Sequence, residues 1–131
     1  DSYDYLVLLQ PTQPLRKPFH IDEAIEKMLE LEAESLVSVS KVKEHPVLIR
    51  TIGEDGKLQN LLNCSSTVRR QDFPDFYRVN GAIYINKIDE NLNETTSLND
   101  NIIPYEMAHE YDVDIDELLD LKIAELMLED N

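Results

Sequence analysis

The stretch Tyr5–Gln10, YLVLLQ, decides the fold class of this chain, because it is a short apolar run that a proline ends. Its length and flanks favour a β-strand that is buried on both faces, as in a parallel sheet. After Pro18 the apolar residues recur at helical spacing, which predicts an amphipathic helix with Asp22 and Glu23 in its first turn. Leu36–Val42, LVSVSKV, predicts a second strand. A strand, a helix and a strand within about forty residues indicate a right-handed βαβ crossover and an α/β fold.

The rest of the chain alternates short extended segments with polar loops. A glycine at Gly81 is expected to permit a backbone turn into the strand that follows it. The other expected elements are an extended segment at Val47–Ile52, a hairpin turn at Gly53–Gly56, a strand at Ala82–Asn86, a loop or short helix at Asp89–Asp100, a brief strand at Asp112–Ile115 and an amphipathic helix at Glu117–Leu128.

Length and composition exclude several classes of protein. The chain has 131 residues, which is one domain or less, and 12 basic against 27 acidic residues give it a net charge of −15. No apolar run approaches the roughly 20 residues that a membrane span needs, so we expect no membrane and no secretory segment. Strong acidity argues against nucleic acid as a partner. A single cysteine, Cys64, fits a cytoplasmic location.

Basic residues are concentrated in the middle of this acidic chain. Lys41–Lys87 holds eight basic and five acidic residues. Such a local excess of positive charge is what binding of a small anionic molecule would need, although solvated surface charge is the more ordinary origin for most of these residues. Within this stretch, Arg70 and Arg78 suit a carboxylate or a phosphate, because a guanidinium donates two parallel hydrogen bonds. The alternative is that both are surface arginines paired with Asp72 and Asp75.

Two further polar segments follow expected strands. Gln10 ends the first strand, where its amide can both donate to and accept from a polyhydroxylated ligand, although Pro11 and Pro14 also suit a merely stiff loop. Asp114 and Asp116 have the two-residue spacing that places both carboxylates on one face of an extended segment. Two carboxylates can hold Mg²⁺, whereas the alternative is that Asp116 caps the last helix.

Three ordered blocks of the sequence resemble one enzyme family, the CMP–sialic acid synthetases (acylneuraminate cytidylyltransferases). LLQPTQPLR, Leu8–Arg16, is similar to the motif LLQPTSPLR of that family, with Gln13 in place of the usual serine. RRQDFPDFYRVNGAIYI, Arg69–Ile85, resembles the block RRQDxPxxYxxNGAIYI. DVDIDELLDLKIAE, Asp112–Glu125, resembles the ending DIDTxxDLxxAE. The blocks span nearly the whole chain.

This resemblance implies a Mg²⁺-dependent transfer of CMP from CTP to the anomeric hydroxyl of an acidic nine-carbon sugar, with release of pyrophosphate. It also implies a Rossmann-like, glycosyltransferase-A-like nucleotidyltransferase fold with a three-layer sheet. By the same resemblance the catalytic residues are Asp114, Asp116 and Arg70, of which the two aspartates hold the metal and Arg70 is lent by the partner subunit of a homodimer. The implied sugar-binding residues are Gln10, Arg78, Asn80 and Tyr84, and the implied dimerisation extension is Lys43–Val68.

The sequence departs from this family pattern in two places. No stretch of Asp1–Asn131 matches the loop like ARGGSKGxxxKN that receives CTP in the family. We therefore expect residues 1–131 to be the C-terminal part of one cytidylyltransferase domain, with YLVLLQ as a bare sheet edge that pairs with the missing portion or with a second copy. Ser97 and Leu98 stand where some relatives carry aromatic residues, which leaves sialic, legionaminic and pseudaminic acids open. The alternatives are a non-catalytic paralogue that serves as an interaction module, and a cytidylyltransferase for another acidic sugar.

Overall fold

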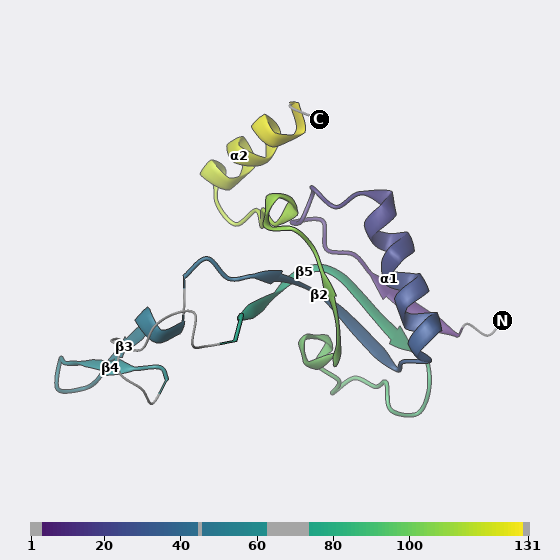
Figure 1. Cartoon of the computed structure of the whole chain (residues 1–131), viewed down its shortest axis with the longest axis horizontal. Coiled ribbons are helices and arrows are strands. Elements are labelled where there is room, and N and C mark those ends of the chain that lie inside the picture. Colours follow the sequence, from purple (N-terminus) through teal and green to yellow (C-terminus); the bar gives the residue numbers. More distant parts are fainter. Residues whose placement is uncertain (1–3, 45, 63–73, 130–131) are drawn as a thin grey trace. The chain divides into compact units, whose positions relative to one another are not determined.

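The computed structural model describes residues 4–44, 46–62 and 74–129 of the chain, and it has a mixed α/β fold. The chain divides into two compact units (Figure 1). The first unit consists of Asp1–Ser40 and Val79–Asn131, and the second is Lys41–Arg78. None of the helices in the described residues is both long and apolar enough to pass through a bilayer.

A four-stranded mixed sheet, in the order β1-β5-β2-β6, is the centre of the first unit. β1 runs antiparallel to β5, and β2 runs parallel to β6. β5 is also antiparallel to β2, since the amide of Lys87 at its end donates to the carbonyl of Glu34. β1 and β2 are therefore parallel strands of one sheet, as the predicted strand–helix–strand crossover requires, and β5 lies between them. The strands are β1 (Tyr5–Leu8), β2 (Ser35–Lys41), β5 (Tyr77–Lys87) and β6 (Ile103–Glu106).

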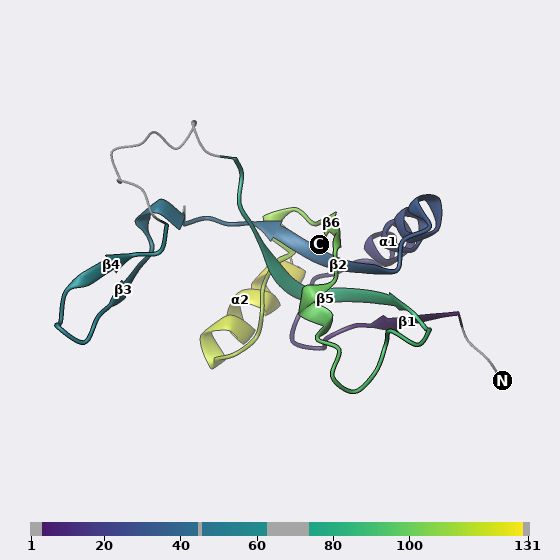
Figure 2. The ribbon, with the colours of Figure 1, turned by 90° about the horizontal axis from the view of Figure 1, so that it is seen from below.

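β1 forms one edge of this sheet (Figure 2). The sequence predicts a strand here, and the structure confirms it. The prediction that both faces of this strand are buried is wrong. All four side chains of β1 are exposed, and Leu6 and Leu8 keep 41% and 42% of their surface. The bare apolar edge expected from the sequence is thus present among the described residues.

Helix α1 (Pro18–Leu31) confirms the predicted amphipathic helix. It begins at Pro18 itself, so Asp22 and Glu23 lie beyond its first turn, contrary to the prediction. The ring nitrogen Nδ1 of His20 accepts a hydrogen bond from the backbone amide of Lys17 at 2.8 Å, which satisfies a donor at the helix start. The chain leaves the helix at Glu32, whose φ of 49° is left-handed.

The hydrophobic core joins α1 to β2, β5 and β6. Periodicity places Ala24 and Met28 on the inner face of α1, and both are buried. Leu29 lies on the predicted face but is 54% exposed, because β1 and α1 cover each other incompletely there. The buried members of the core are Ala24, Met28, Leu36, Ala82, Ile83, Ile85, Tyr105 and Met107.

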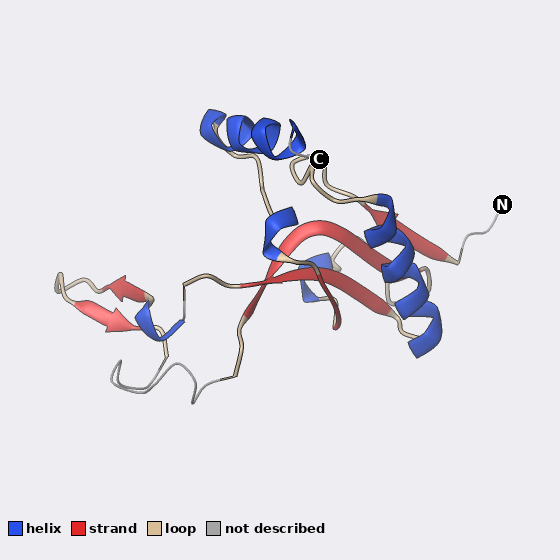
Figure 3. Cartoon of the chain, turned by 45° about the horizontal axis from the view of Figure 1, so that its top comes forward, coloured by secondary structure: helices blue, strands red, loops and turns tan. Residues whose placement is uncertain are grey.

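The C-terminal region differs most from the prediction. β6 has no predicted counterpart, and its proline makes it an atypical strand. Residues 112–115 form no strand and follow the short 3₁₀ helix η4 (His109–Tyr111), as the loop before α2 in Figure 3 shows. The predicted terminal helix is confirmed as α2 (Leu118–Glu129), although only Ala124 is buried among its described residues.

The second unit contains the predicted hairpin. The short 3₁₀ helix η1 (Pro46–Leu48) precedes β3 (Arg50–Ile52), which pairs antiparallel with β4 (Leu58–Asn60). The segment predicted to be extended is therefore part helix and part strand. At the base of this unit the amide of Val42 donates to the carbonyl of Phe76 at 2.9 Å. Its role as a dimerisation extension stays a prediction.

Candidate functional site

The end of the first strand, the middle of β5 and the acidic segment before α2 meet at one place. Gly81 has a φ of +78°, in which a left-handed backbone favours glycine. A Cβ at this position would overlap with Oε1 of Gln10 and would lie 3.7 Å from the hydroxyl of Tyr84. The missing side chain therefore makes room for the Gln10 amide beside Tyr84, and two predicted site residues are brought together.

The loop that carries Gln10 is held by its own side chains. One guanidinium nitrogen of Arg16 donates to the carbonyls of Gln10 and Gln13, each at 2.7 Å. The amide of Gln13 donates to the Gln10 carbonyl at 3.2 Å and closes a turn. Burial lowers the pKa of Arg16, but a guanidinium stays charged at any physiological pH. This loop is thus pinned in one conformation behind Gln10.

Asp114 lies beside Tyr84, and one of its carboxylate oxygens is buried without a hydrogen-bond donor among the described residues. Its Oδ1 is buried and has no hydrogen-bond partner in the described part of the chain. Burial raises the pKa of the Tyr84 phenol, and the negative charge of Asp114 raises it further. A buried carboxylate oxygen without a donor is unfavourable by roughly 1–3 kcal/mol or more. The site is therefore suited to a ligand that brings positive charge or a hydrogen-bond donor to Asp114.

Asp116 is exposed, two residues further along the chain. The sequence left open that Asp116 caps the last helix, but Asp120 makes the hydrogen bonds to the backbone amides before that helix. Oδ2 of Asp120 accepts the backbone amides of Asp116 and Glu117 at 3.1 and 3.0 Å, and so satisfies donors that precede α2. The carboxylate of Asp116 is consequently open to solvent.

Asn80 is predicted to contact the sugar, and its amide is engaged inside the sheet. The side chain is only 3% exposed. Its Oδ1 accepts hydrogen bonds from the Ser38 hydroxyl at 2.5 Å and from the Ala82 amide at 3.0 Å. Its Nδ2 donates to the Ser40 hydroxyl at 2.7 Å. These bonds hold the backbone on both sides of Gly81, which explains why β5 continues through an Asn-Gly pair that ordinarily marks a turn.

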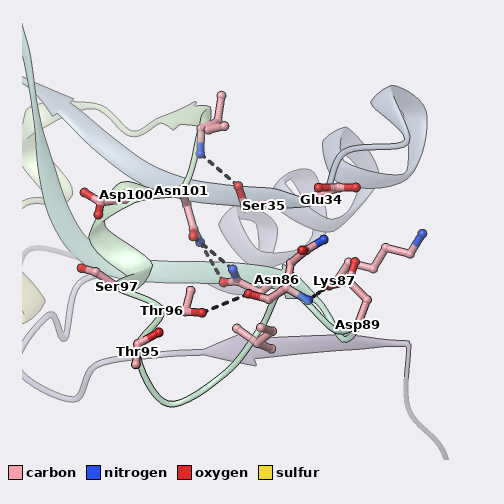
Figure 4. A pocket seen from close by; sticks show the side chains of 13 residues that line it. Glu34, Ser35, Asn86, Lys87, Asp89, Thr95, Thr96, Ser97, Asp100 and Asn101 are labelled. Atoms are coloured by element: carbon pink, nitrogen blue, oxygen red, sulfur yellow. Dashed lines mark hydrogen bonds between the residues drawn. The ribbon is translucent and has the colours of Figure 1, made fainter.

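A polar cavity of about 370 Å³ lies at the other end of β5 (Figure 4). Alternate residues of the loop bind alternate residues of the strand: Tyr84 donates to Asn99 at 2.8 Å, and Asn86 donates to Asn101 at 3.1 Å. Asn101 donates back to Asn86 at 2.8 Å, so the two amides form a closed pair in the cavity wall. Ser97, predicted to stand near the acyl group of the sugar, lines this cavity.

The structure does not test the predicted roles of the two arginines. Arg70 lies outside the described residues. Arg78 is exposed and belongs to the second unit, so its place in a sugar site stays a prediction. The alternative of surface ion pairing also stays open, although Asp75 has Lys41 as one ion-pair partner at 3.2 Å.

Sequence reasoning missed two residues of this region, Gln13 and Asn99. Gln13 is 1% exposed, and its Nε2 donates to the Asp112 carboxylate at 3.0 Å and to the backbone carbonyl of Asn80 at 2.5 Å. Its replacement of serine in the LLQPTSPLR motif was the available signal. Asn99 gave none, since it stands in a polar loop without periodicity.

The predicted metal site offers a divalent cation few protein ligands, the carboxylates of Asp114 and Asp116. Among residues 4–44, 46–62 and 74–129, no group of three or more His, Cys, Asp and Glu side chains could hold a metal ion. Mg²⁺ ordinarily takes one or two carboxylates and completes its shell with waters and substrate phosphates. Asp114, whose Oδ1 has no partner in the described part of the chain, and the exposed Asp116 stay the predicted ligands of such an ion.

Comparison with known proteins agrees with the family resemblance of the three blocks. No protein-family model matches the chain. An N-acylneuraminate cytidylyltransferase of Streptococcus agalactiae serotype V is 37% identical over 110 residues, which are 84% of this chain and 27% of that protein. The chain belongs to the N-acylneuraminate cytidylyltransferase family. It spans about a quarter of the length of this curated relative.

Other members of the family align with even more of the chain. The N-acylneuraminate cytidylyltransferase B of Danio rerio is 31% identical over 125 residues, 93% of this chain and 29% of that protein. The CMP-N,N'-diacetyllegionaminic acid synthase of Legionella pneumophila is 29% identical over 139 aligned positions, 98% of this chain and 56% of that protein. The N-acylneuraminate cytidylyltransferases and this synthase carry names that differ in the sugar.

Proposed function

We propose that the protein carrying this chain transfers CMP from CTP to the anomeric hydroxyl of a sialic-acid-like nonulosonic acid and releases pyrophosphate. The observation that carries the proposal is the buried, unpartnered Oδ1 of Asp114 beside Tyr84. It lies where three motif blocks of one enzyme family converge. The mixed α/β fold is compatible with the Rossmann-like nucleotidyltransferase architecture that we propose for the whole domain.

The sugar is proposed to bind next to Gly81. Gln10 offers both a donor and an acceptor to the hydroxyls of the sugar. Tyr84 stays protonated at physiological pH, because burial and Asp114 raise its pKa, so it is not a base; its hydroxyl donates to Asn99 and can accept a hydrogen bond from a sugar hydroxyl. Arg78 is proposed to bind the sugar carboxylate, while Asn80 fixes the strand on which the site is built.

The metal is proposed to be Mg²⁺, held by Asp114 and Asp116. When bound, it supplies positive charge that offsets the charge developing on the phosphoryl group in transfer. The task of the two aspartates is to fix that charge on the side of the site that Tyr84 borders. No general base is assigned to this chain, and the anomeric hydroxyl is expected to lose its proton to water.

The partner subunit is proposed to complete the site. Lys43–Val68 would form the contact of a homodimer, and Arg70 would reach the triphosphate of the neighbouring subunit. This arrangement would explain why basic residues are concentrated in Lys41–Lys87 of an acidic chain. Size measurement of the full-length gene product tests it, with a dimer expected and a monomer at enzyme-assay concentrations contradicting it.

Pyrophosphate release from the full-length gene product tests the proposed reaction. The assay supplies CTP, Mg²⁺ and, in separate reactions, sialic, legionaminic, pseudaminic and an eight-carbon acidic sugar. Release is expected with one or more of the nine-carbon acids and with CTP in preference to other nucleotides. Release with the eight-carbon sugar alone would indicate another cytidylyltransferase, and no release with any sugar would favour an interaction module without catalysis.

A further inference from the structure

Gln13 is buried where the acidic segment meets the sheet, and its amide group bridges two elements. Nε2 donates to the carbonyl of Asn80 on β5 and to Oδ1 of Asp112, at 2.5 and 3.0 Å. Both partners are acceptors, which fixes the orientation of the amide with its nitrogen toward them. Oε1 of Gln13 is buried and has no partner among the described residues. Burying Oε1 without a partner is unfavourable, so the two hydrogen bonds that Nε2 donates are what holds the Gln13 side chain in this position.

The neighbouring residue provides a second anchor for the same segment. The carbonyl of Thr12 accepts the backbone amide of Ile115 at 2.8 Å. Thr12 and Gln13 therefore hold residues 112 and 115, which flank Asp114 on both sides. Residues 112–115 belong to no helix or strand, so these bonds replace the backbone ladder that would otherwise fix their course.

The position of Asp114 depends on such support. Its Oδ1 is buried without a donor, and the Asp112 carboxylate adds like charge two residues away. Both charges are better hydrated in open water, so an unsupported segment would move outward. The Gln13 side chain opposes this movement, because it donates to Asp112 and to β5 at the same time.

We propose that Gln13 is a positioning residue for metal binding, which acts through Asp112 to hold Asp114 beside Tyr84. This inference rests on the proposed function, in which Asp114 holds Mg²⁺. A hydroxyl has one hydrogen to donate and could reach only one of the two acceptors. The serine that is usual at this place in the resembling motif could not make the same bridge.

The loop itself does not need the Gln13 side chain for its conformation. Arg16 binds the carbonyls of Gln10 and Gln13, and the backbone turn between these residues is separate from the side-chain amide. A change at Gln13 that preserves side-chain length should therefore leave the loop folded. It should alter the acidic segment selectively.

The decisive variant is Gln13→Glu in the full-length gene product, assayed for pyrophosphate release over a range of Mg²⁺ concentrations and pH. An ionised carboxylate cannot donate to Asp112, so at pH 8 we expect about a 10- to 100-fold loss of activity or Mg²⁺ affinity. Burial and the neighbouring Asp112 charge raise the pKa of a carboxyl at this position, so the loss should shrink as the pH falls and a protonated carboxyl donates again. A purely structural role would instead lower the thermal midpoint of the variant and leave its Mg²⁺ dependence unchanged.

Two further variants keep the test decisive. Gln13→Met preserves length without charge or donor, and it should lose Mg²⁺ affinity at every pH, which serves if Gln13→Glu does not fold. Gln59→Glu is the matched control, since Gln59 is exposed in the β3–β4 hairpin, and its Mg²⁺ dependence should equal that of wild type. A folded Gln13→Glu or Gln13→Met variant with wild-type Mg²⁺ dependence would overturn the proposal.

Calorimetric titration with MgCl₂ separates this inference from the proposed reaction. If the wild type releases no pyrophosphate, the proposed function fails, and Gln13 is judged by binding alone. Weaker Mg²⁺ binding in Gln13→Met than in wild type supports the positioning role. Equal binding in the two proteins, or no binding by the wild type, overturns it.

Discussion

The hydroxyl of Tyr84 donates a 2.8 Å hydrogen bond to Oδ1 of Asn99, and this bond joins the middle of β5 to the loop that follows the strand. The same tyrosine lies next to Gly81 and feels the charge of Asp114. The Tyr84 side chain thus connects the predicted ligand-binding residues Gln10 and Asp114 with Asn99, a loop residue that no sequence pattern indicated.

Tyr84→Phe removes that hydroxyl and leaves the ring in place. We expect KM for the sugar to rise by about two- to tenfold, which corresponds to a net hydrogen bond of about 0.5–1.5 kcal/mol, with KM for CTP nearly unchanged. Steady-state kinetics with each substrate varied in turn measures the difference. Tyr77→Phe is the control, because Tyr77 is 45% exposed at the start of β5. Equal kinetics in the wild type and Tyr84→Phe would remove Tyr84 from the sugar site.

Asp114→Ala and Asp116→Ala test the proposed metal ligands in the full-length gene product. Both should abolish Mg²⁺-dependent pyrophosphate release. The thermal midpoint of Asp114→Ala should equal or exceed that of wild type, because a buried carboxylate without a donor is removed. Glu117→Ala is the control, as Glu117 is exposed and adjacent to the pair. Near-normal turnover in either aspartate variant would refute the metal role.

Gly81→Ala and Gly56→Ala form a matched pair, since their φ values are +78° and +77°. Both should lose about 1–2 kcal/mol of stability, which is the cost of a left-handed conformation for alanine. Only Gly81→Ala also displaces Gln10, because nothing lies within 4 Å of a Cβ at Gly56. Denaturant unfolding and KM for the sugar should therefore separate the two variants, and a normal KM in Gly81→Ala would contradict this account.

Arg78→Ala should raise KM for the sugar far more than KM for CTP, because a guanidinium is proposed to bind the sugar carboxylate. Arg50→Ala provides a comparison within the second unit, where Arg50 donates to the carbonyl of Val47 at 2.5 Å. An equal rise in both KM values for Arg78→Ala would instead indicate a role in nucleotide binding.

His20 makes the stability of the first unit dependent on pH. Desolvation lowers the pKa of His20 most, Glu23 opposes this shift and Lys17 adds to it. Above about pH 6.5 the imidazole is neutral in both the folded and the unfolded chain, so it adds no pH dependence. Below that pH the unfolded chain binds a proton that the folded chain excludes, and stability should fall until the folded pKa is passed.

Unfolding of wild type and His20→Gln between pH 7.5 and 5 measures this contribution. The fall in stability should be smaller in His20→Gln, because the glutamine does not titrate. His109→Gln serves as a control, since His109 is exposed. An identical pH dependence in the wild type and His20→Gln would contradict the assignment.

The helices and the first two strands could be predicted because their signals are local. The apolar period after Pro18 led to α1, and LVSVSKV led to β2 within one residue at each end. The strand order was not predictable in this way, because β5 enters between β1 and β2 from a distant part of the chain. β6 escaped detection, since a four-residue strand with a proline carries little periodic signal.

The candidate site was predictable to the extent that motifs mark it. Gln10, Tyr84 and Asp114 were expected, and the structure brings them together around Gly81. The side chain of Asn80 could not be placed, because its bonds to Ser38 and Ser40 depend on the pairing of two strands. Gln13 likewise acquires its partners only when residues far apart in the sequence meet.

The hydrogen bond between the Val42 amide and the Phe76 carbonyl has a consequence for protein engineering and evolution. This bond joins the segment that enters the second unit to the segment that leaves it, so Val42 and Phe76 are neighbours across one hydrogen bond. A segment that starts and ends at two such neighbours can be lengthened, shortened or exchanged for a two-residue turn without interrupting the pairing of β2 with β5. Chimeras spliced between Val42 and Phe76 would exchange residues 43–75 while retaining the sheet of the first unit.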